Sequence, residues 1–170
     1  MQTPEPHPIT IELTIEAEDW GEESAVRAEI ERAVAASMTV GRFDLPPYTE
    51  LSVVLTDDTH IRELNRTWRG KDKATNVLSF PVGEQHEVEI SDDYADPPLL
   101  LGDIVVARET LVREAEEEAK SVADHFTHLL VHGFVHLMGY DHEDDAEADE
   151  MEALEAEILA SLGIANPYAD

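Results

Sequence analysis

The sequence contains no cysteine, and this absence excludes disulfide bonds, thiolate metal ligands and a cysteine nucleophile. No apolar run approaches the roughly 20 residues that a membrane-spanning helix needs. The first residues lack the basic and apolar regions of a signal peptide. With 170 residues, 42% of them hydrophobic, the chain fits a single globular domain over residues 1–170. We therefore expect a cytoplasmic protein with no membrane association.

Positive charge is also scarce, because 11 Lys and Arg residues face 39 Asp and Glu residues, a formal net charge of −28. Solubility or a salt-adapted host explains such acidity, and a functional acidic surface is the alternative. Either way the overall field repels nucleic acid, so any such partner must be held by a local exception. One exception exists, since five of the eleven basic residues share one short stretch: Arg62, Arg66, Arg69, Lys71 and Lys73.

Hydrophobic periodicity predicts an α/β (α+β) fold, with a small mixed sheet of about four strands packed against about five helices. The expected strands are residues 9–15, 51–55, 76–80 and 100–107. The expected helices are residues 22–38, a segment from the capping Asp57 or Asp58 to Gly70, and residues 108–120, 122–138 and 147–162. Residues 83–98 form an acidic loop, with a hairpin extension as the alternative, and residues 163–170 form a C-terminal tail.

The stretch "HLLVHGFVHLMGYDH" contains the spacing H-x-x-x-H-x-x-G-x-x-H at His132, His136 and His142. Two histidines four residues apart share one face of a helix. Gly139 then suits the helix end, because glycine adopts a left-handed conformation at low cost, and the chain can bring His142 back to the same point. Three imidazoles with one open position are typical of a catalytic zinc site. We therefore predict one zinc ion, or another divalent transition metal, held by these three residues.

Other polar residues near this motif have less certain roles. His128 lies one turn before His132 on the same face, so it lines a cleft, binds a group behind the metal ligands or packs in the core. His125 is expected at the surface. Asp141 orients a ligand imidazole or caps the loop.

The spacing matches that of zinc peptidases, H-E-x-x-H-x-x-G-x-x-H, except that Gly133 replaces the glutamate that acts as the base. No Asp or Glu lies between His125 and Met138 to replace it. Peptide hydrolysis is therefore disfavoured, and chemistry that needs less help from a base stays open. Phosphodiester cleavage is one example, because a metal ion and a cation can together stabilise the phosphate charge.

The basic stretch supplies such cations. We predict nucleic-acid contacts from Arg66, Arg69, Lys71 and Lys73, with Arg69 as the residue that stabilises phosphate charge, since an arginine fork binds phosphate through two parallel hydrogen bonds. The helix dipole alone explains some basic residues at a helix end. Trp68 is expected in the core rather than as a platform for stacking bases.

Three motifs together resemble the bacterial YbeY-type endoribonucleases: "HGFVHLMGYDH", "RGKDKATNVLSFP" and "LGDIVV". "DDAEADEMEALEAEIL" resembles the last helix of that family. The resemblance implies a single-domain, cytoplasmic, metal-dependent endonuclease specific for single-stranded RNA, in which the three motif histidines hold a zinc-like ion and Arg69 serves activity. It also implies maturation of ribosomal RNA, notably the small-subunit 3′ end, ribosome quality control and association with ribosomal components.

Two other functions stay open at this point. One is a ribosome-assembly factor without catalysis, in which the metal only stabilises the Gly139 loop. The other is a zinc-dependent peptidase or amide hydrolase, against which Gly133 argues. No DNA partner is expected.

Overall fold

The computed structural model describes residues 9–46, 49–82, 99–141 and 143–168. Within these ranges, strands and helices follow one another in the predicted order, and the predicted mixed α/β fold is confirmed. The elements are β1 (Ile9–Ile15), α1 (Glu23–Gly41), β2 (Thr49–Thr56), α2 (Asp58–Arg69), β3 (Val77–Pro81), β4 (Leu99–Ala107), α3 (Arg108–Glu117), α4 (Val122–Leu137) and α5 (Asp145–Ser161). The predicted acidic loop, residues 83–98, lies outside the described residues.

The four strands form one sheet in the order β1-β2-β4-β3. β1 pairs parallel to β2, and β2 pairs parallel to β4, with Val53 opposite Ile104. β3 pairs antiparallel to β4, with Ser79 opposite Ile104. The apolar, buried second half of β4, residues 104–107, follows from this position, because a strand in the middle of a covered sheet is buried on both faces.

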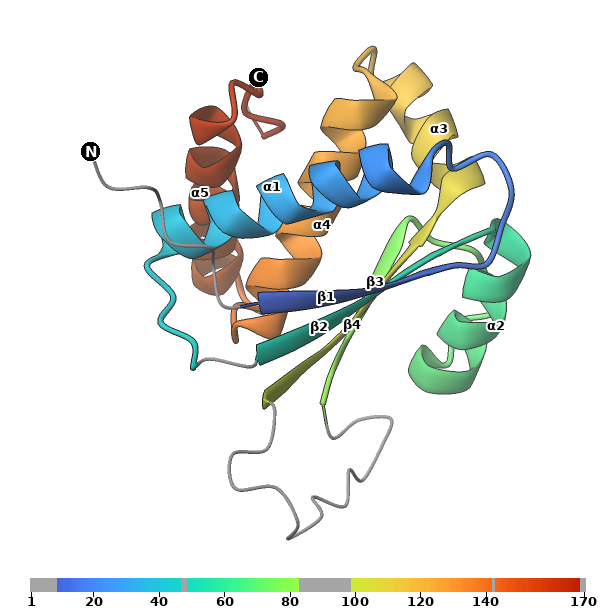
Figure 1. Ribbon diagram of the computed structural model, residues 1–170, viewed down its shortest axis with the longest axis horizontal. Helices are drawn as coiled ribbons and strands as arrows, with labels where there is room; N and C mark the ends of the chain where they lie inside the picture. The colour runs from blue at the N-terminus through green and yellow to red at the C-terminus, as the bar shows by residue number, and fades with distance from the viewer. Residues whose placement is uncertain (1–8, 47–48, 83–98, 142, 169–170) are drawn as a thin grey trace, which may run out of the picture.

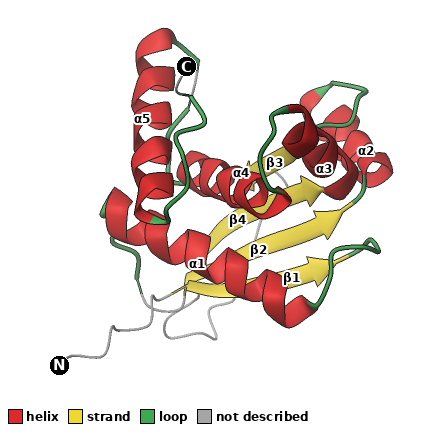
Figure 2. Ribbon diagram, turned by 90° about the horizontal axis from the view of Figure 1, so that it is seen from above, coloured by secondary structure: helices red, strands yellow, loops and turns green. Residues whose placement is uncertain are grey.

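Helices cover both faces of the sheet (Figures 1 and 2). α1 and α4 cover one face of the sheet, and α5 packs against these two helices. α2 lies on the other face, near β4. Alternation along β4 separates the two cores, since Ile104 and Val106 contribute to the large cluster under α1 and α4, and Val105 contributes to the small cluster with Ile61 of α2. α4 is thereby placed directly on the sheet, with its histidine-bearing end near β3 and β4.

Side-chain caps mark the first turns of α2, α4 and α5. Asp57 accepts a hydrogen bond from the His60 backbone N–H at 2.8 Å, Ser121 accepts one from Asp124 at 3.0 Å, and Asp144 accepts one from Glu147 at 2.8 Å. Each satisfies a backbone donor that the first helical turn leaves without a partner. Because Ser121 begins α4, the phase of that helix, and hence the direction of its histidines, is set at its first turn.

The loop after α4 begins at Gly139, as the sequence predicts, with φ of 105°. α3, in contrast, ends at Glu117, three residues before the predicted end. Ala119 adopts a left-handed conformation with φ of 55°, so the chain turns there toward α4. The loss of one turn from α3 does not change the order of the elements.

His125 is buried, with 4% of its surface exposed, so its prediction as a surface residue is wrong. Its Nε2–H donates to Glu114 Oε1 at 2.9 Å, and the Asn76 side-chain amide donates to the same oxygen at 2.9 Å. This network joins the start of β3 to α3 and α4. The helical periodicity of α4 placed His125 on the histidine face but did not reveal that α3 covers that face at its first turns.

Candidate functional site

The histidine face of α4 carries His128, His132 and His136, each one turn after the previous one. Four helical residues rise about 6 Å, so neighbouring rings of this series lie within reach of a common small ion or of each other. The His132 side chain is 30% exposed, so this face is open to solvent only in part. The structure thus brings His132 and His136 together on one face, while His142 lies outside the described residues.

A buried carboxylate on α5 lies against this face. Glu155 is 1% exposed, and its Oε1 lies 3.0 Å from His132 Nδ1. The hydrogen bond assigns the Nδ1 proton to the Glu155 contact, and Nε2 is then the ring nitrogen suited to a metal ion. Histidines that bind metals in proteins usually have such a carboxylate or carbonyl partner, which orients the ring and raises its basicity.

Glu155 remains ionised despite its burial. Burial opposes the charged carboxylate, but the hydrogen bonds from His128 and His132, together with the charge on both rings, outweigh it and lower the pKa of Glu155 to about 2. The sequence did not single out this residue. The sequence did contain one signal, because Glu155 lies between Met151 and Ile158 on the apolar side of an amphipathic helix. A carboxylate is rarely buried in such a position unless it is paired.

His128 joins the same network. Its Nε2 lies 3.1 Å from the Tyr168 hydroxyl and 3.4 Å from Glu155 Oε1. Tyr168 belongs to the predicted tail, residues 163–170, yet its hydroxyl donates to both Glu155 oxygens at 3.2 Å. Burial and the charge of Glu155 both raise the pKa of Tyr168, so this hydroxyl stays protonated and serves as a donor.

Gly133, the residue that replaces the peptidase glutamate, faces the sheet. A Cβ atom at this position would lie 3.0 Å from Ile104 Cγ2 of β4, closer than ordinary packing allows. Glycine therefore lets α4 approach the sheet, and a longer side chain at this position would enter the core before it reached the histidine face. Glycine at this position therefore removes the base of the peptidases and also allows the close packing of α4 on β4.

Arg69, the last residue of α2, turns toward β3. Its Nη2–H donates to the Ser79 carbonyl at 3.0 Å, and its guanidinium lies 4.8 Å from the centre of the Phe80 ring. The capping of α2 is done instead by Gly70, whose φ is 70° and whose N–H reaches the Asn65 carbonyl. Arg69 is therefore held in one direction by the backbone and the aromatic ring of β3.

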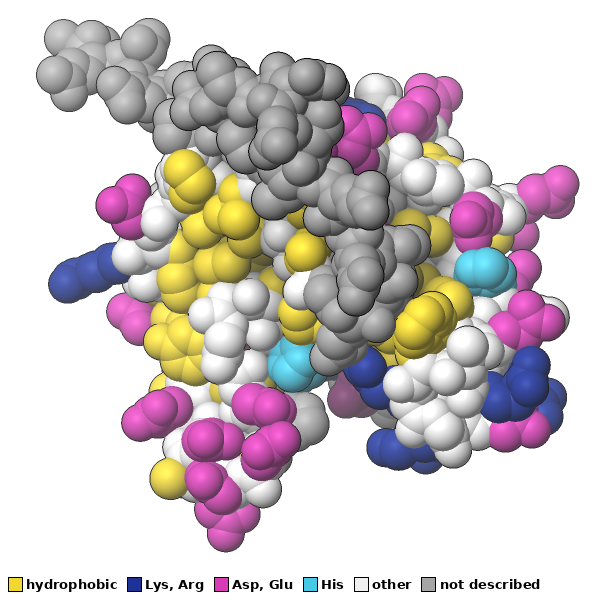
Figure 3. All heavy atoms as spheres, turned by 90° about the horizontal axis from the view of Figure 1, so that it is seen from below, with side chains coloured by type: hydrophobic (Ala, Val, Ile, Leu, Met, Phe, Trp, Pro, Cys, Tyr) yellow, Lys and Arg dark blue, Asp and Glu magenta, His cyan; other side chains and the backbone are white. Residues whose placement is uncertain are grey.

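The end of β3 connects Arg69 to the histidine helix. At Gly102 a Cβ atom would touch both the Phe80 carbonyl and the Leu137 side chain, so β3, β4 and the end of α4 meet at this glycine. Leu137 directly follows His136, and Ser79, the partner of Arg69, directly precedes Phe80. Figure 3 views the molecule from below, and on this face a histidine side chain and Lys or Arg side chains are visible.

The remaining basic residues lie at the end of α2 and in the turn that follows. Arg66, Lys71 and Lys73 are exposed. The turn is fastened from within, because the buried Asn65 donates a hydrogen bond from its side chain to the Lys73 carbonyl at 2.9 Å. Arg62 differs from the others, since it pairs with Asp72 at 2.8 Å and so contributes less positive charge to the surface.

Trp68 is exposed, with 42% of its surface accessible, so the prediction that it belongs to the core is wrong. It continues the apolar side of α2 after Ile61 and Leu64, but the small core on that side of the sheet ends before it. An indole beside Arg66 and Arg69 is consequently available at the surface. Asp141 is half-buried in the loop that follows α4.

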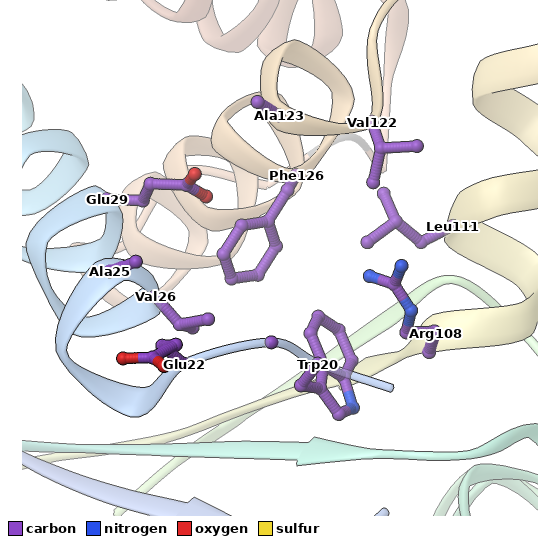
Figure 4. Close-up of a pocket in the computed structure, with 11 residues that line it drawn as sticks. Trp20, Glu22, Ala25, Val26, Glu29, Arg108, Leu111, Val122, Ala123 and Phe126 are labelled. Carbon is purple, nitrogen blue, oxygen red and sulfur yellow. The ribbon is translucent and has the colours of Figure 1, made fainter. Parts of the chain in front are cut away.

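A separate pocket lies at the carboxyl ends of β1, β2 and β4, between α1, α3 and α4 (Figure 4). Trp20, Phe126 and Leu111 line it, and the Arg108 guanidinium lies 5.5 Å from the Trp20 ring. The Trp20 indole N–H donates to the Thr56 carbonyl at 3.3 Å. Phe126 precedes His136 by ten residues, about 15 Å along α4, so this pocket is distinct from the histidine face.

Within the described ranges, which leave out His142, no three His, Asp or Glu side chains form a group that would hold a metal ion. No described helix is long and apolar enough to span a bilayer.

The fold and this site define an α/β protein with a histidine-rich helix, a buried carboxylate behind it and a basic turn at the neighbouring strand. The sequence model of the family "Endoribonuclease YbeY" matches residues 12–163. A protein from Nitrobacter winogradskyi named Endoribonuclease YbeY is 51% identical over 162 residues, which cover 95% of this chain and 83% of the relative. A protein of the same name from Bradyrhizobium diazoefficiens is 53% identical over 163 residues, covering 96% and 86%. This chain belongs to the Endoribonuclease YbeY family.

A solved structure is similar as well. The solution structure of TM1509 from Thermotoga maritima superimposes with a TM-score of 0.50 and 22% sequence identity, covering 95% of this chain and 99% of that chain. At this level of identity the likeness supports the fold alone.

Proposed function

We propose that the protein is a metal-dependent endoribonuclease that cleaves single-stranded RNA. Membership of a family whose relatives are named endoribonucleases supports RNA cleavage. The observation that carries the metal dependence is the pairing of His132 Nδ1 with the buried Glu155 at 3.0 Å, because such a carboxylate is what a metal-binding imidazole requires behind it.

His132, His136 and His142 would hold the ion, and zinc suits three imidazoles with one open position. When bound, such an ion supplies Lewis acidity that polarises a phosphoryl oxygen and assists attack by water at neutral pH. The residues of the chain fit this role, since His132 donates through Nδ1 to Glu155 and can present Nε2 for coordination.

Arg69 would stabilise the negative charge that develops on the phosphate. Its anchoring to Ser79 and Phe80 fixes the direction of the guanidinium before RNA arrives, which is the condition for effective charge stabilisation. Arg66, Lys71 and Lys73 would contact neighbouring phosphates, and the exposed Trp68 would stack on a base, as aromatic residues do in proteins that bind single strands.

The substrate we propose is ribosomal RNA, at the small-subunit 3′ end, in the cytoplasm and together with ribosomal components. This finer assignment is supported by the motifs shared with the family. Specificity for single strands agrees with a small basic surface on an acidic protein, because a duplex would bring its second strand against the acidic remainder.

The decisive experiment measures metal content and cleavage of a single-stranded RNA by the purified protein, by a His136→Ala variant and by a His60→Ala control. His60 lies on α2 and pairs with Glu16 at 3.2 Å, so its removal changes one histidine without touching α4. We expect His136→Ala to lose bound metal and cleavage together, and His60→Ala to keep both.

Undiminished cleavage by metal-free His136→Ala would overturn metal dependence. Wild-type protein that binds metal and RNA but leaves every RNA intact would favour the ribosome-assembly factor instead. A parallel assay with an unstructured polypeptide substrate tests the peptidase alternative, for which we expect no activity.

A further inference from the structure

Three side chains from two segments surround the carboxylate of Glu155: His128 and His132 of α4, and Tyr168 after α5. Its Oε1 lies 3.0 Å from His132 Nδ1 and 3.4 Å from His128 Nε2, and the Tyr168 hydroxyl donates to both oxygens at 3.2 Å. In the described part of the chain, its ion-pair partners are these two histidines and include no Lys or Arg. Among the described residues, the positive charges within ion-pair distance of Glu155 are therefore those that His128 and His132 can carry.

The proton of each group in this network can be assigned. Tyr168 has one hydroxyl proton and donates it to Glu155, so its oxygen accepts the Nε2–H of His128, 3.1 Å away. His132 donates through Nδ1. The Tyr168 ring is set in place locally, because its backbone N–H donates to the Asn166 side chain at 2.9 Å and its ring packs edge-on against His128 at 5.6 Å between centroids.

Core packing does not explain a carboxylate at position 155. The neighbouring inward positions of α5 are Met151, Ile158 and Leu159, all buried and apolar. An isolated buried acid costs stability unless it is paired, and apolar residues usually pack such positions at least as well. The carboxylate therefore serves the groups that it contacts, and among the described residues its partner from the histidine motif is His132.

We propose that Glu155 is the positioning residue of His132 and that Tyr168 positions Glu155, so that residues 163–168 after α5 set the metal affinity of a site on α4. This inference deepens the proposed function and rests on it for the presence of the ion. Removing the carboxylate would let the His132 ring rotate and change tautomer. Removing the tyrosine hydroxyl would loosen the carboxylate while leaving its charge.

The test is a chelator-competition measurement of zinc affinity for the wild-type protein and four variants: Glu155→Gln, Tyr168→Phe, Glu157→Gln and His132→Ala. Glu157 is exposed on the same helix, so Glu157→Gln removes the same charge outside the network. We expect affinity to fall about 10–100-fold for Glu155→Gln and about fivefold for Tyr168→Phe, the value of one net hydrogen bond. Glu157→Gln should bind zinc as the wild type does.

A second measurement needs no substitution of Glu155 or Tyr168. Nitrogen-15 spectra of the histidine rings in the zinc-loaded wild-type protein should show His132 protonated at Nδ1 and bound to metal through Nε2, with the resonance assigned from His132→Ala. This result keeps the proposal testable if Glu155→Gln fails to fold. Coordination through Nδ1 would overturn it.

The outcomes separate the inference from the function on which it rests. If the wild type and His132→Ala bind zinc equally, the metal site itself is wrong. If His132→Ala loses zinc while Glu155→Gln and Tyr168→Phe keep wild-type affinity, the metal site stands and the positioning role is refuted. Equal losses in Glu155→Gln and Glu157→Gln would refute it too, because they would reduce the effect to overall charge.

Discussion

The two halves of the candidate site are built in opposite ways. The half formed by His132 and Glu155 borders the core, since Glu155 is 1% exposed and Gly133 allows α4 to lie close to β4. The basic half is at the surface, where Trp68 is 42% exposed and Arg66 is solvent-facing. A metal ligand must be held within tenths of an ångström, whereas phosphate contacts tolerate movement and act over longer range. In this fold, the rigid packed helices carry proposed metal ligands.

Arg69 shares features of both halves of the site. It is exposed like the other basic residues, yet it is tied to Ser79 and Phe80 of β3. Arg62, although part of the same sequence cluster, is paired with Asp72 and projects less charge. We therefore expect Arg69 to stabilise charge in the reaction, and Arg66, Lys71 and Lys73 to attract RNA in general.

The substitution Arg69→Lys tests this assignment and carries the largest expected effect. Lysine keeps the charge but loses the planar fork and the contact with the Phe80 ring. Loss of one preorganised stabilising donor typically lowers kcat by about 10²–10³-fold. We expect that loss in single-turnover cleavage, with metal content and RNA affinity close to the wild type. Arg66→Lys is the matched control and should cleave nearly normally. Wild-type rates for Arg69→Lys would remove its catalytic role.

Trp68→Leu probes the exposed half alone. Stacking of one base on an aromatic ring contributes about 1–3 kcal/mol, so RNA affinity should fall about 5–150-fold. Metal binding should not change. Trp20 is buried, so quenching of tryptophan fluorescence by single-stranded RNA should come from Trp68 and disappear in the variant. Equal affinity of Trp68→Leu and wild type for RNA would show that the indole does not contact the substrate.

Gly133→Ala tests the packed half through stability. The new methyl group would meet Ile104, and overpacking of a core typically costs about 1–3 kcal/mol, partly offset by the higher helix propensity of alanine. Thermal or chemical denaturation measures this change. The double variant Gly133→Ala/Ile104→Ala should lose less free energy of unfolding than the sum of the single variants, because the clash is removed. An additive result would mean that the helix shifts without strain.

The order of strands and helices was predictable because each element carries its own local signal. Alternation identified β1, the apolar stretch of residues 51–55 identified β2, and capping aspartates marked the start of α2. The two wrong residue assignments share one cause. Trp68 and His125 were judged from the face of their own helix, but burial depends on what another element places over that face. The small core stops short of Trp68, and α3 covers His125.

The sequence by itself determined the spacing of His132 and His136, the glycine that ends their helix and the concentration of basic residues after Ile61. These are properties of neighbouring positions, and helical geometry alone turns them into a common face. Only the tertiary structure decided that Glu155 and Tyr168 lie behind His132, and that Arg69 is fixed on β3. The contacts of Glu155 and Tyr168 with the histidines exist because α5 packs against α4. The contact of Arg69 exists because β3 returns beside the end of α2.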